Sequence, residues 1–258
     1  MRNHKRFKPE YNDSDIAIIG MACRFAESQT PDEFWQSLTT GKDLICEIPP
    51  DRWDYHSWFD PSPQTPGKTY SKWGSFIKDI DKFDPSFFNM SPLEAELMDP
   101  QLRLLLSVLY ETVEDAGYAR NIWGTKTGMF VGAWTHEYRD QIIKSIKGNN
   151  LYKELGNHAS MLANRPSYFF DLRGPSLSVD TACSSSLVAL HLACKSLHHG
   201  ECDMAFVGSA NLLLSPLHYL WLCELGVLSP TGRCHIWLVN HYIMANVIWL
   251  LWVVLTCF

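Results

Sequence analysis

The sequence predicts an α/β protein in which helices cover the faces of a parallel β-sheet. Apolar runs that close on glycine at 15–20 and 127–132 are typical of buried strands. A strand pattern at 176–182, a helical pattern at 184–199 and a strand pattern at 202–208 follow one another directly. Such a unit predicts two parallel strands with the connecting helix on the face of their sheet. This helix is apolar on almost all sides, so we expect it to be buried deep inside the fold.

Three further helices are predicted from their start signals. Thr30, Ser91 and Asp99 each precede a proline, which fits the first helical position, and each can cap a helix with its side-chain oxygen. Glu33 and Glu94 stand where the acidic member of a capping box is expected. These signals place helix starts at residues 30, 91 and 99.

The segments between these elements are predicted from composition. The helix from Asp99 to Gly117 carries leucine and valine at spacings of three and four, so one face should be buried. Residues 46–75 combine five prolines with three tryptophans, which indicates an ordered loop pinned by aromatic rings. Residues 136–158 are polar, and we expect a surface excursion there.

Composition excludes several classes of function. The 258 residues carry a net charge of -6, whereas a nucleic-acid partner needs a basic surface that neutralises phosphates. The eight cysteines form no Cys-x-x-Cys pair and stand beside no histidine at metal-ligand spacing, so we expect no metal site. The basic start, residues 1–13, is expected to be a disordered leader and not a secretory signal. We therefore expect a cytoplasmic protein with reduced thiols.

Cys183 is the candidate nucleophile. It lies between the predicted strand and the apolar helix, so its backbone N–H and those of Ser184 and Ser185 belong to the first helical turn, where amides lack intrahelical partners. The partial positive charge of a helix start stabilises a thiolate. The same amides, including that of Cys183, can hold the oxyanion that forms when a thioester is attacked. These features alone fit a buried structural cysteine as well.

The run Asp180-Thr-Ala-Cys183-Ser-Ser-Ser-Leu187 resembles the active-site signature of β-ketoacyl synthases, in the form found in modular polyketide synthases and animal fatty-acid synthase. Other segments that resemble this family occur in the family's order at 18–24, 99–103, 114–117, 174–180, 200–203 and 225–230. Cys183 would be the nucleophile, and the residues that support the motif are Asp180, Thr181, Ala182, Ser184 and Ser185.

The resemblance covers residues 14–234 and implies the N-terminal half of a thiolase-like fold, which has layered α/β/α/β/α halves. It implies that an acyl chain passes from the phosphopantetheine of an acyl carrier protein to Cys183. A malonyl-type extender is then decarboxylated, and its carbanion attacks the acyl thioester. The resemblance implies no directly bound cofactor, an acyl carrier protein as partner, and a homodimer in intact family members.

Two histidine motifs of the family do not occur in this sequence. The family stabilises its enolate with a His-Gly-Thr-Gly-Thr motif and with a Gly-His motif that follows a lysine. Lys195 and His198 resemble the second motif superficially, but they lie several turns beyond Cys183 on the same predicted helix. We therefore expect a chain that cannot condense. Because the two halves of this fold pack together, one half should leave a large apolar face exposed.

Residues 235–258 form an apolar tail that does not match the family and contains no Asp, Glu, Lys or Arg. Three interpretations stay open: an aberrant end such as that of an alternative transcript, a membrane anchor within 236–258, or a buried pairing segment. The alternative functions are a non-catalytic interaction or dominant-negative fragment and a membrane-tethered fragment. A degradative thiolase is a weaker alternative, because its cysteine motif differs.

Overall fold

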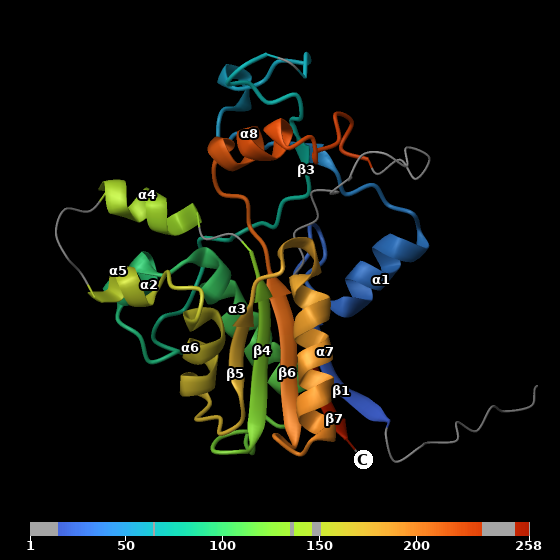
Figure 1. Cartoon of the computed structure of the whole chain (residues 1–258), viewed down its shortest axis with the longest axis vertical. Helices are drawn as coiled ribbons and strands as arrows, with labels where there is room; N and C mark the ends of the chain where they lie inside the picture. Colours follow the sequence, from blue (N-terminus) through green and yellow to red (C-terminus); the bar gives the residue numbers. More distant parts are fainter. Residues whose placement is uncertain (1–14, 64, 135–136, 146–150, 234–250, 258) are drawn as a thin grey trace, which may run out of the picture.

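The computed structural model describes residues 15–63, 65–134, 137–145, 151–233 and 251–257 (Figure 1). The predicted leader, residues 1–13, lies outside the described residues. The elements in chain order are β1 (Ile16–Cys23), α1 (Pro31–Thr39), β2 (Cys46–Glu47), η1 (Tyr55–Ser57), β3 (Trp73–Gly74), α2 (Pro92–Leu97), α3 (Pro100–Asp115), β4 (Thr127–Ala133), α4 (Glu137–Ser145), α5 (Leu151–Leu155), α6 (Met161–Phe169), β5 (Ser176–Val179), η2 (Ala182–Ser184), α7 (Ser185–His198), β6 (Met204–Ala210), α8 (Pro216–Glu224) and β7 (Leu251–Cys257).

A five-stranded sheet with the order β1-β7-β6-β4-β5 forms the centre of the structure (Figure 1). Strand β4 pairs in parallel with β5 on one side and with β6 on the other. The strands of the predicted strand–helix–strand unit, β5 and β6, are therefore parallel, but β4 lies between them. Strand β7 is antiparallel to both of its neighbours, β1 and β6.

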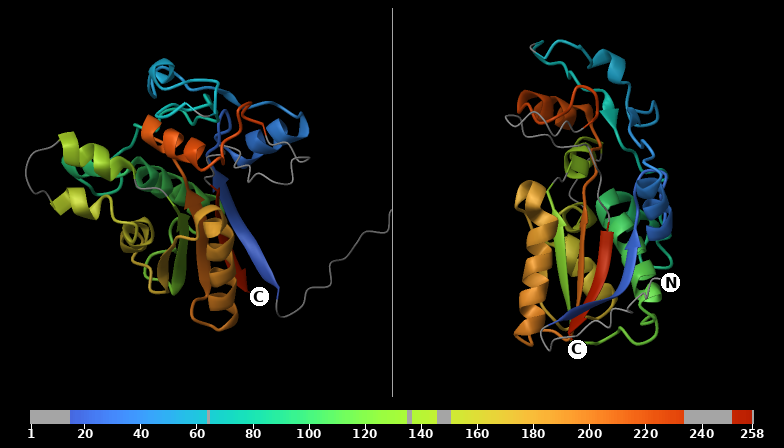
Figure 2. Two further views of the ribbon diagram at one scale, coloured as in Figure 1. Left: turned by 45° about the horizontal axis from the view of Figure 1, so that its top comes forward. Right: turned by 90° about the vertical axis from the view of Figure 1, so that its right-hand side faces the viewer.

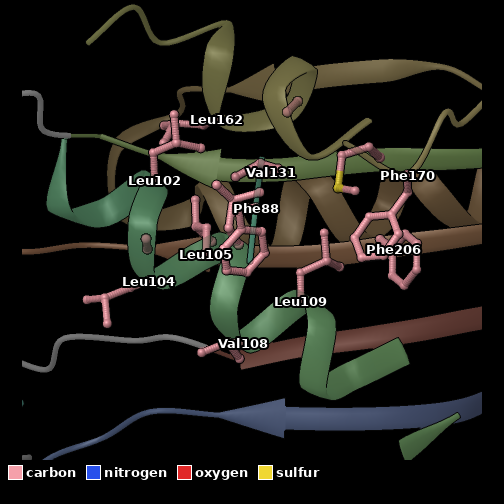
Figure 3. Close-up of a cluster of buried hydrophobic side chains, with 14 of the residues drawn as sticks. Phe88, Leu102, Leu104, Leu105, Val108, Leu109, Val131, Leu162, Phe170 and Phe206 are labelled. Carbon is pink, nitrogen blue, oxygen red and sulfur yellow. The ribbon is translucent and has the colours of Figure 1, made fainter. Parts of the chain in front are cut away.

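Helices cover both faces of this sheet, α7 on one and α3 with α6 on the other (Figure 2). The alternation of side chains along the strands explains the two layers. Val131 and Phe206 join Leu105 of α3 in one buried cluster (Figure 3), whereas Phe130 joins Ala189 of α7 in another. The predicted α/β architecture is confirmed, with helices on both faces of the sheet.

The predicted helix starts are confirmed in atomic detail. Thr30 Oγ1 accepts a hydrogen bond from the Glu33 amide at 3.2 Å, and Ser91 Oγ accepts one from the Glu94 amide at 3.1 Å. Asp99 caps α3 through the amide two residues further on, at 2.8 Å. Each cap satisfies an amide that the first helical turn leaves without a partner.

The prediction that the helix at 184–199 is buried deep inside the fold is wrong for its outer face. Ala189 and Ala193 of α7 pack fully buried against the sheet, but Leu187 is 70% exposed and Leu190 is exposed as well. The sheet covers one side of α7, and within the described part of the chain no element covers the other side. The apolar sequence of the helix thus leaves an open apolar face.

The prediction of a surface excursion at 136–158 also needs correction. This segment contains α4 and α5, and two of its polar residues, Glu137 and Asn157, are buried. The side-chain amide of Asn157 donates to the carbonyl of Leu97 at 2.8 Å and to that of Lys153 at 2.7 Å. Hydrogen bonds of this kind offset the cost of burying a polar group, so polar composition alone does not place a segment at the surface.

Part of the apolar tail lies inside the sheet. Residues 251–257 form β7 between β1 and β6, with Gly20 and Phe206 both opposite Val254. This placement corresponds to the interpretation of the tail as a pairing segment. No helix among the described residues is long and apolar enough to cross a membrane.

Candidate active site

Cys183 lies where the chain turns from β5 into α7. Strand β5 ends at Val179, the short 3-10 turn η2 spans Ala182–Ser184, and α7 begins at Ser185. Because β4, β5 and β6 are parallel, their carboxyl ends meet at one edge of the sheet, at the top in Figure 1. The Cys183 side chain is exposed at this edge, at the strand-to-helix junction that the sequence predicts.

The turn places the residue before the cysteine in an unusual backbone conformation. Ala182 has a φ of 52°, in the left-handed region that residues with a Cβ atom rarely adopt. A conformation of this kind costs on the order of 1–3 kcal/mol and persists only where the surroundings enforce it. The side chain of Asp180 is one such constraint, because its Oδ1 accepts a hydrogen bond from the Ala182 amide at 3.0 Å.

Two serines of the motif also hold the turn. The Ser185 hydroxyl accepts a hydrogen bond from the Thr181 amide at 2.9 Å and lies 2.7 Å from the Ala182 carbonyl, to which it donates. The Ser184 hydroxyl lies 2.9 Å from the Thr181 carbonyl and 3.0 Å from the Thr181 hydroxyl. The sequence indicates only that serine suits a first helical turn; the structure gives these hydroxyls specific partners.

A glycine of the neighbouring strand lies directly beneath the start of α7. A Cβ atom on Gly132 of β4 would lie 2.7 Å from the carbonyl carbon of Ser185 and 2.7 Å from the amide nitrogen of Ser186. No side chain fits between two backbones this close. The sequence around Gly132 indicates only the end of a strand, and the contact of Gly132 with α7 is visible in the structure alone.

Two of the three amides that the sequence offers as oxyanion donors are used inside the turn. The Ser184 amide donates to the Thr181 carbonyl at 3.3 Å, and the Ser185 amide donates to the Ala182 carbonyl. These two bonds compete with oxyanion binding by the same amides. The expectation that amides of this turn hold an oxyanion, that of Cys183 among them, stays a prediction.

Lys195 and His198 lie in the last turn of α7, at the end opposite to Cys183. At a rise of about 1.5 Å per residue, the twelve positions from Cys183 to Lys195 correspond to roughly 18 Å. The first turn of α7 contains no acidic residue. The charges along α7 thus favour an anion at its start, because the amide end of a helix carries partial positive charge.

A second polar cluster follows the carboxyl ends of β4 and β6. Glu137 accepts hydrogen bonds from the Ser215 hydroxyl at 2.7 Å and from the Leu214 amide at 3.3 Å, and His218 Nδ1 lies 3.3 Å from its Oε1 atom. Burial raises the pKa of Glu137 to about 7 and lowers the pKa of His218. No sequence motif indicates this cluster, because its members come from segments far apart in the chain.

The other described cysteines differ from Cys183 in their surroundings. Cys23 and Cys202 are buried, and burial raises the pKa of both thiols to about 11. Cys223 is buried as well, and burial also raises its pKa. Cys46 is exposed but stands in the two-residue strand β2, away from any helix start. Among the described cysteines, Cys183 alone combines exposure with a position at a helix start.

Comparison with known proteins shows relatives along most of the chain. Polyketide synthase PksL of Bacillus subtilis is 48% identical over an alignment of 234 residues that covers 87% of this chain and 5% of that protein. Reducing polyketide synthase ppsB of Aspergillus oryzae is 48% identical over an alignment of 229 residues that covers 87% of this chain and 9% of that protein. The chain therefore spans only a small part of each of these relatives.

Solved structures show the same likeness. The ketosynthase from module 6 of the bacillaene synthase of Bacillus subtilis has a TM-score of 0.83 at 38% identity, covering 93% of this chain and 40% of that chain. The oxazolomycin ketosynthase domain KS7 of Streptomyces albus has a TM-score of 0.82 at 37% identity, covering 94% and 42%. The predicted thiolase-like α/β fold is confirmed by this likeness.

The family model that matches is described as the N-terminal domain of β-ketoacyl synthase, and the match extends over residues 13–240. This range contains the turn with Cys183 and the parallel strands that support it. Since the match covers most of the sequence, the chain belongs to the family of β-ketoacyl synthase N-terminal domains, and its relatives are ketosynthase domains of polyketide synthases.

Proposed function

We propose that Cys183 accepts an acyl chain from the phosphopantetheine arm of an acyl carrier protein. The observation that carries this proposal is the exposure of the Cys183 side chain on a constrained turn at the start of α7. A helix start favours the thiolate, which is the nucleophilic form of cysteine. The family to which the chain belongs supports the same chemistry.

The transfer is a thioester exchange. The Cys183 sulfur attacks the carbonyl carbon of the acyl thioester, and the carbonyl oxygen becomes an oxyanion, toward which the Cys183 amide is the proposed donor. The bond between the carbonyl carbon and the pantetheine sulfur then breaks. The pantetheine thiolate leaves and takes up a proton, which balances the proton that the Cys183 thiol loses. The exchange therefore consumes no cofactor.

This chain alone should stop at the acylated cysteine. Decarboxylation of a malonyl-type extender produces a carbanion that needs electrostatic stabilisation, and the sequence lacks both histidine motifs that the family uses for it. The proposal is therefore acyl loading without condensation by the chain as it stands. Condensation would need groups that stabilise this carbanion in place of the two missing motifs.

Acyl transfer can be tested with an acyl-pantetheine thioester and intact-mass measurement. We expect one acyl adduct on the wild-type chain and none on Cys183→Ala. Cys46→Ala, which removes the other exposed described thiol, is the matched control and should be acylated like the wild type. Acylation of Cys183→Ala to the wild-type extent would contradict the proposal, and a β-ketoacyl product formed by this chain alone would contradict the absence of condensation.

A non-catalytic role as a binding partner is the second candidate, and the open apolar face of α7 favours it. Leu187 and Leu190 are exposed on the outer side of α7, whereas Ala189 and Ala193 are buried against the sheet. A fragment that pairs with a full-length synthase through this face should be captured by that synthase even after Cys183→Ala. Loss of capture after Leu187→Asp, with Cys183→Ala still captured, would favour this second candidate.

A further inference from the structure

We infer that Ser185 is a positioning residue. Its hydroxyl holds the turn that contains Cys183, and its backbone packs directly against Gly132. The inference rests on the proposed function, because it concerns how fast Cys183 is acylated. The proposed role of Ser185 does not require contact with the reacting sulfur. It acts through the backbone of Thr181 and Ala182.

The hydroxyl of Ser185 closes a small ring of hydrogen bonds around Ala182. It accepts from the amide of Thr181 at 2.9 Å and donates to the carbonyl of Ala182 at 2.7 Å, so one side chain holds the peptide unit before Thr181 and the peptide unit after Ala182. Ala182 lies between these two hydrogen bonds, and its φ is 52°. Without the hydroxyl, the segment from Thr181 to Ala182 loses two hydrogen bonds that hold Ala182 in a conformation disfavoured for a residue with a Cβ atom.

Ser184 also holds the turn, but its hydrogen bonds are open to water. Its hydroxyl bonds to the carbonyl and the hydroxyl of Thr181, and the residue is exposed. Ser185 is only 5% exposed, so water cannot readily replace its hydrogen bonds. Of the two hydroxyls, that of Ser185 is therefore the one whose loss water compensates least.

Gly132 determines how closely the start of α7 approaches the sheet. The backbone of Ser185 and Ser186 lies so close to Gly132 that a Cβ atom there would meet backbone atoms at 2.7 Å. A backbone contact cannot be relieved by rotating a side chain, so a larger residue at 132 would displace the start of α7. Because Cys183 precedes that start by two residues, its sulfur would move with the helix.

The decisive variant is Ser185→Ala, and α7 itself provides a matched control. Ser196 lies on the same helix at the opposite end, is 6% exposed, and donates to Glu201 Oε2 at 2.5 Å. We expect Ser185→Ala to slow acyl transfer to Cys183 by at least about tenfold, the lower range for a misplaced reacting group. Ser196→Ala should stay within about twofold of the wild-type rate. Equal rates for the two variants would overturn the inference.

A rescue variant separates positioning from a general loss of structure. Glycine adopts a positive φ without steric cost, so Ala182→Gly should restore part of the acylation rate in the Ser185→Ala background. The rates are compared at equal folded fraction, because a glycine at a positive φ also relieves strain in the folded chain and can change its stability. Failure of the rescue, with Ser185→Ala folded by circular dichroism, would overturn the claim that Ser185 acts through Ala182.

The contact between Gly132 and the start of α7 is tested by comparing the acylation rates of Gly132→Ala and Gly128→Ala, two variants on the same strand. A Cβ atom at Gly128 would meet the Phe130 ring at 2.6 Å, which is a side-chain contact remote from the turn. We expect slower acylation for Gly132→Ala than for Gly128→Ala when both are compared at equal folded fraction. The opposite order would contradict the role of Gly132.

A second reagent distinguishes failure of this inference from failure of the proposed function. If the wild-type chain is not acylated, the proposed function is wrong, and iodoacetamide still reports on the position of the thiol. The alkylation rate of Cys183 in a Cys46→Ala background should change with Ser185→Ala, which moves the thiol relative to the helix start, and not with Ser196→Ala. Unchanged alkylation would overturn the inference whatever the acylation result.

Discussion

Replacing Glu137 by glutamine should remove a pH dependence of stability that this buried carboxyl creates. Burial raises the pKa of Glu137 from its ordinary 4.5 to about 7, and the hydrogen bonds from Ser215 and Leu214 only partly oppose this effect. Asp99 is also buried, with a pKa raised by burial to about 6. Because Asp99 is present in both proteins, its contribution cancels to a first approximation in a comparison of wild type with Glu137→Gln.

The sign and size of the effect follow from proton linkage. A carboxyl whose pKa is raised by folding contributes stability that is complete below the pKa of the unfolded chain and is lost as the pH rises through the folded pKa. One pKa unit corresponds to about 1.4 kcal/mol, so the interval from 4.5 to about 7 corresponds to about 3 kcal/mol. His218 acts in the opposite direction, because a lowered pKa of a histidine costs stability as the pH falls.

The assay is urea unfolding of wild type and Glu137→Gln at a series of pH values from about 5 to about 8. Glutamine does not titrate, so the stability of Glu137→Gln relative to wild type should rise by up to about 3 kcal/mol over this range. Glu114→Gln, on the exposed side of α3, is the control and should follow wild type throughout. Parallel curves for wild type and Glu137→Gln would refute the reasoning.

Three further predictions concern the scaffold around the site. Leu105 is 0% exposed, so Leu105→Ala should cost about 2–5 kcal/mol in urea unfolding, while Leu93→Ala, at a residue 49% exposed, should cost less than about 1 kcal/mol; equal losses would contradict the core assignment. Thr30→Ala removes the cap of α1 and should cost about 1 kcal/mol by the same measurement, and no loss would show that the cap is dispensable. Deleting residues 251–257 removes the one described strand that pairs with β1, so the β1 amides should exchange hydrogen faster while those of β4 keep most of their protection; unchanged exchange in β1 would contradict the pairing.

Local signals in the sequence predict the elements that depend on neighbouring residues. The caps at Thr30, Ser91 and Asp99 are confirmed because a capping hydrogen bond joins residues two or three positions apart. The place of Cys183 between a strand and a helix is predictable for the same reason. Its position relative to these elements depends only on the hydrophobic pattern on either side.

Features that depend on distant segments could not be predicted in this way. The contact between Gly132 and Ser185 joins two elements that are far apart in the chain, and no pattern around Gly132 indicates it. The left-handed conformation of Ala182 contradicts the preference of alanine and arises from the hydrogen bonds of its surroundings. The burial of Glu137 likewise depends on Ser215, which follows a different strand.

The exposed side of α7 shows a different limit of prediction. An apolar pattern indicates that a helix face is to be covered, but it does not indicate by what. In the described chain the sheet covers one side of α7, and Leu187 on the other side stays exposed. An apolar pattern on almost all sides therefore does not indicate which face of α7 packs against the sheet.

Peptide-resolved mass spectrometry after incubation with an acyl-pantetheine thioester tests most directly whether the sulfur at the start of α7 is the acyl acceptor. The predicted spectrum carries the acyl mass on the peptide that contains Cys183, and the peptide that contains Cys46 is unmodified. An acyl group spread evenly over the exposed thiols, or found on any residue other than Cys183, would contradict the account.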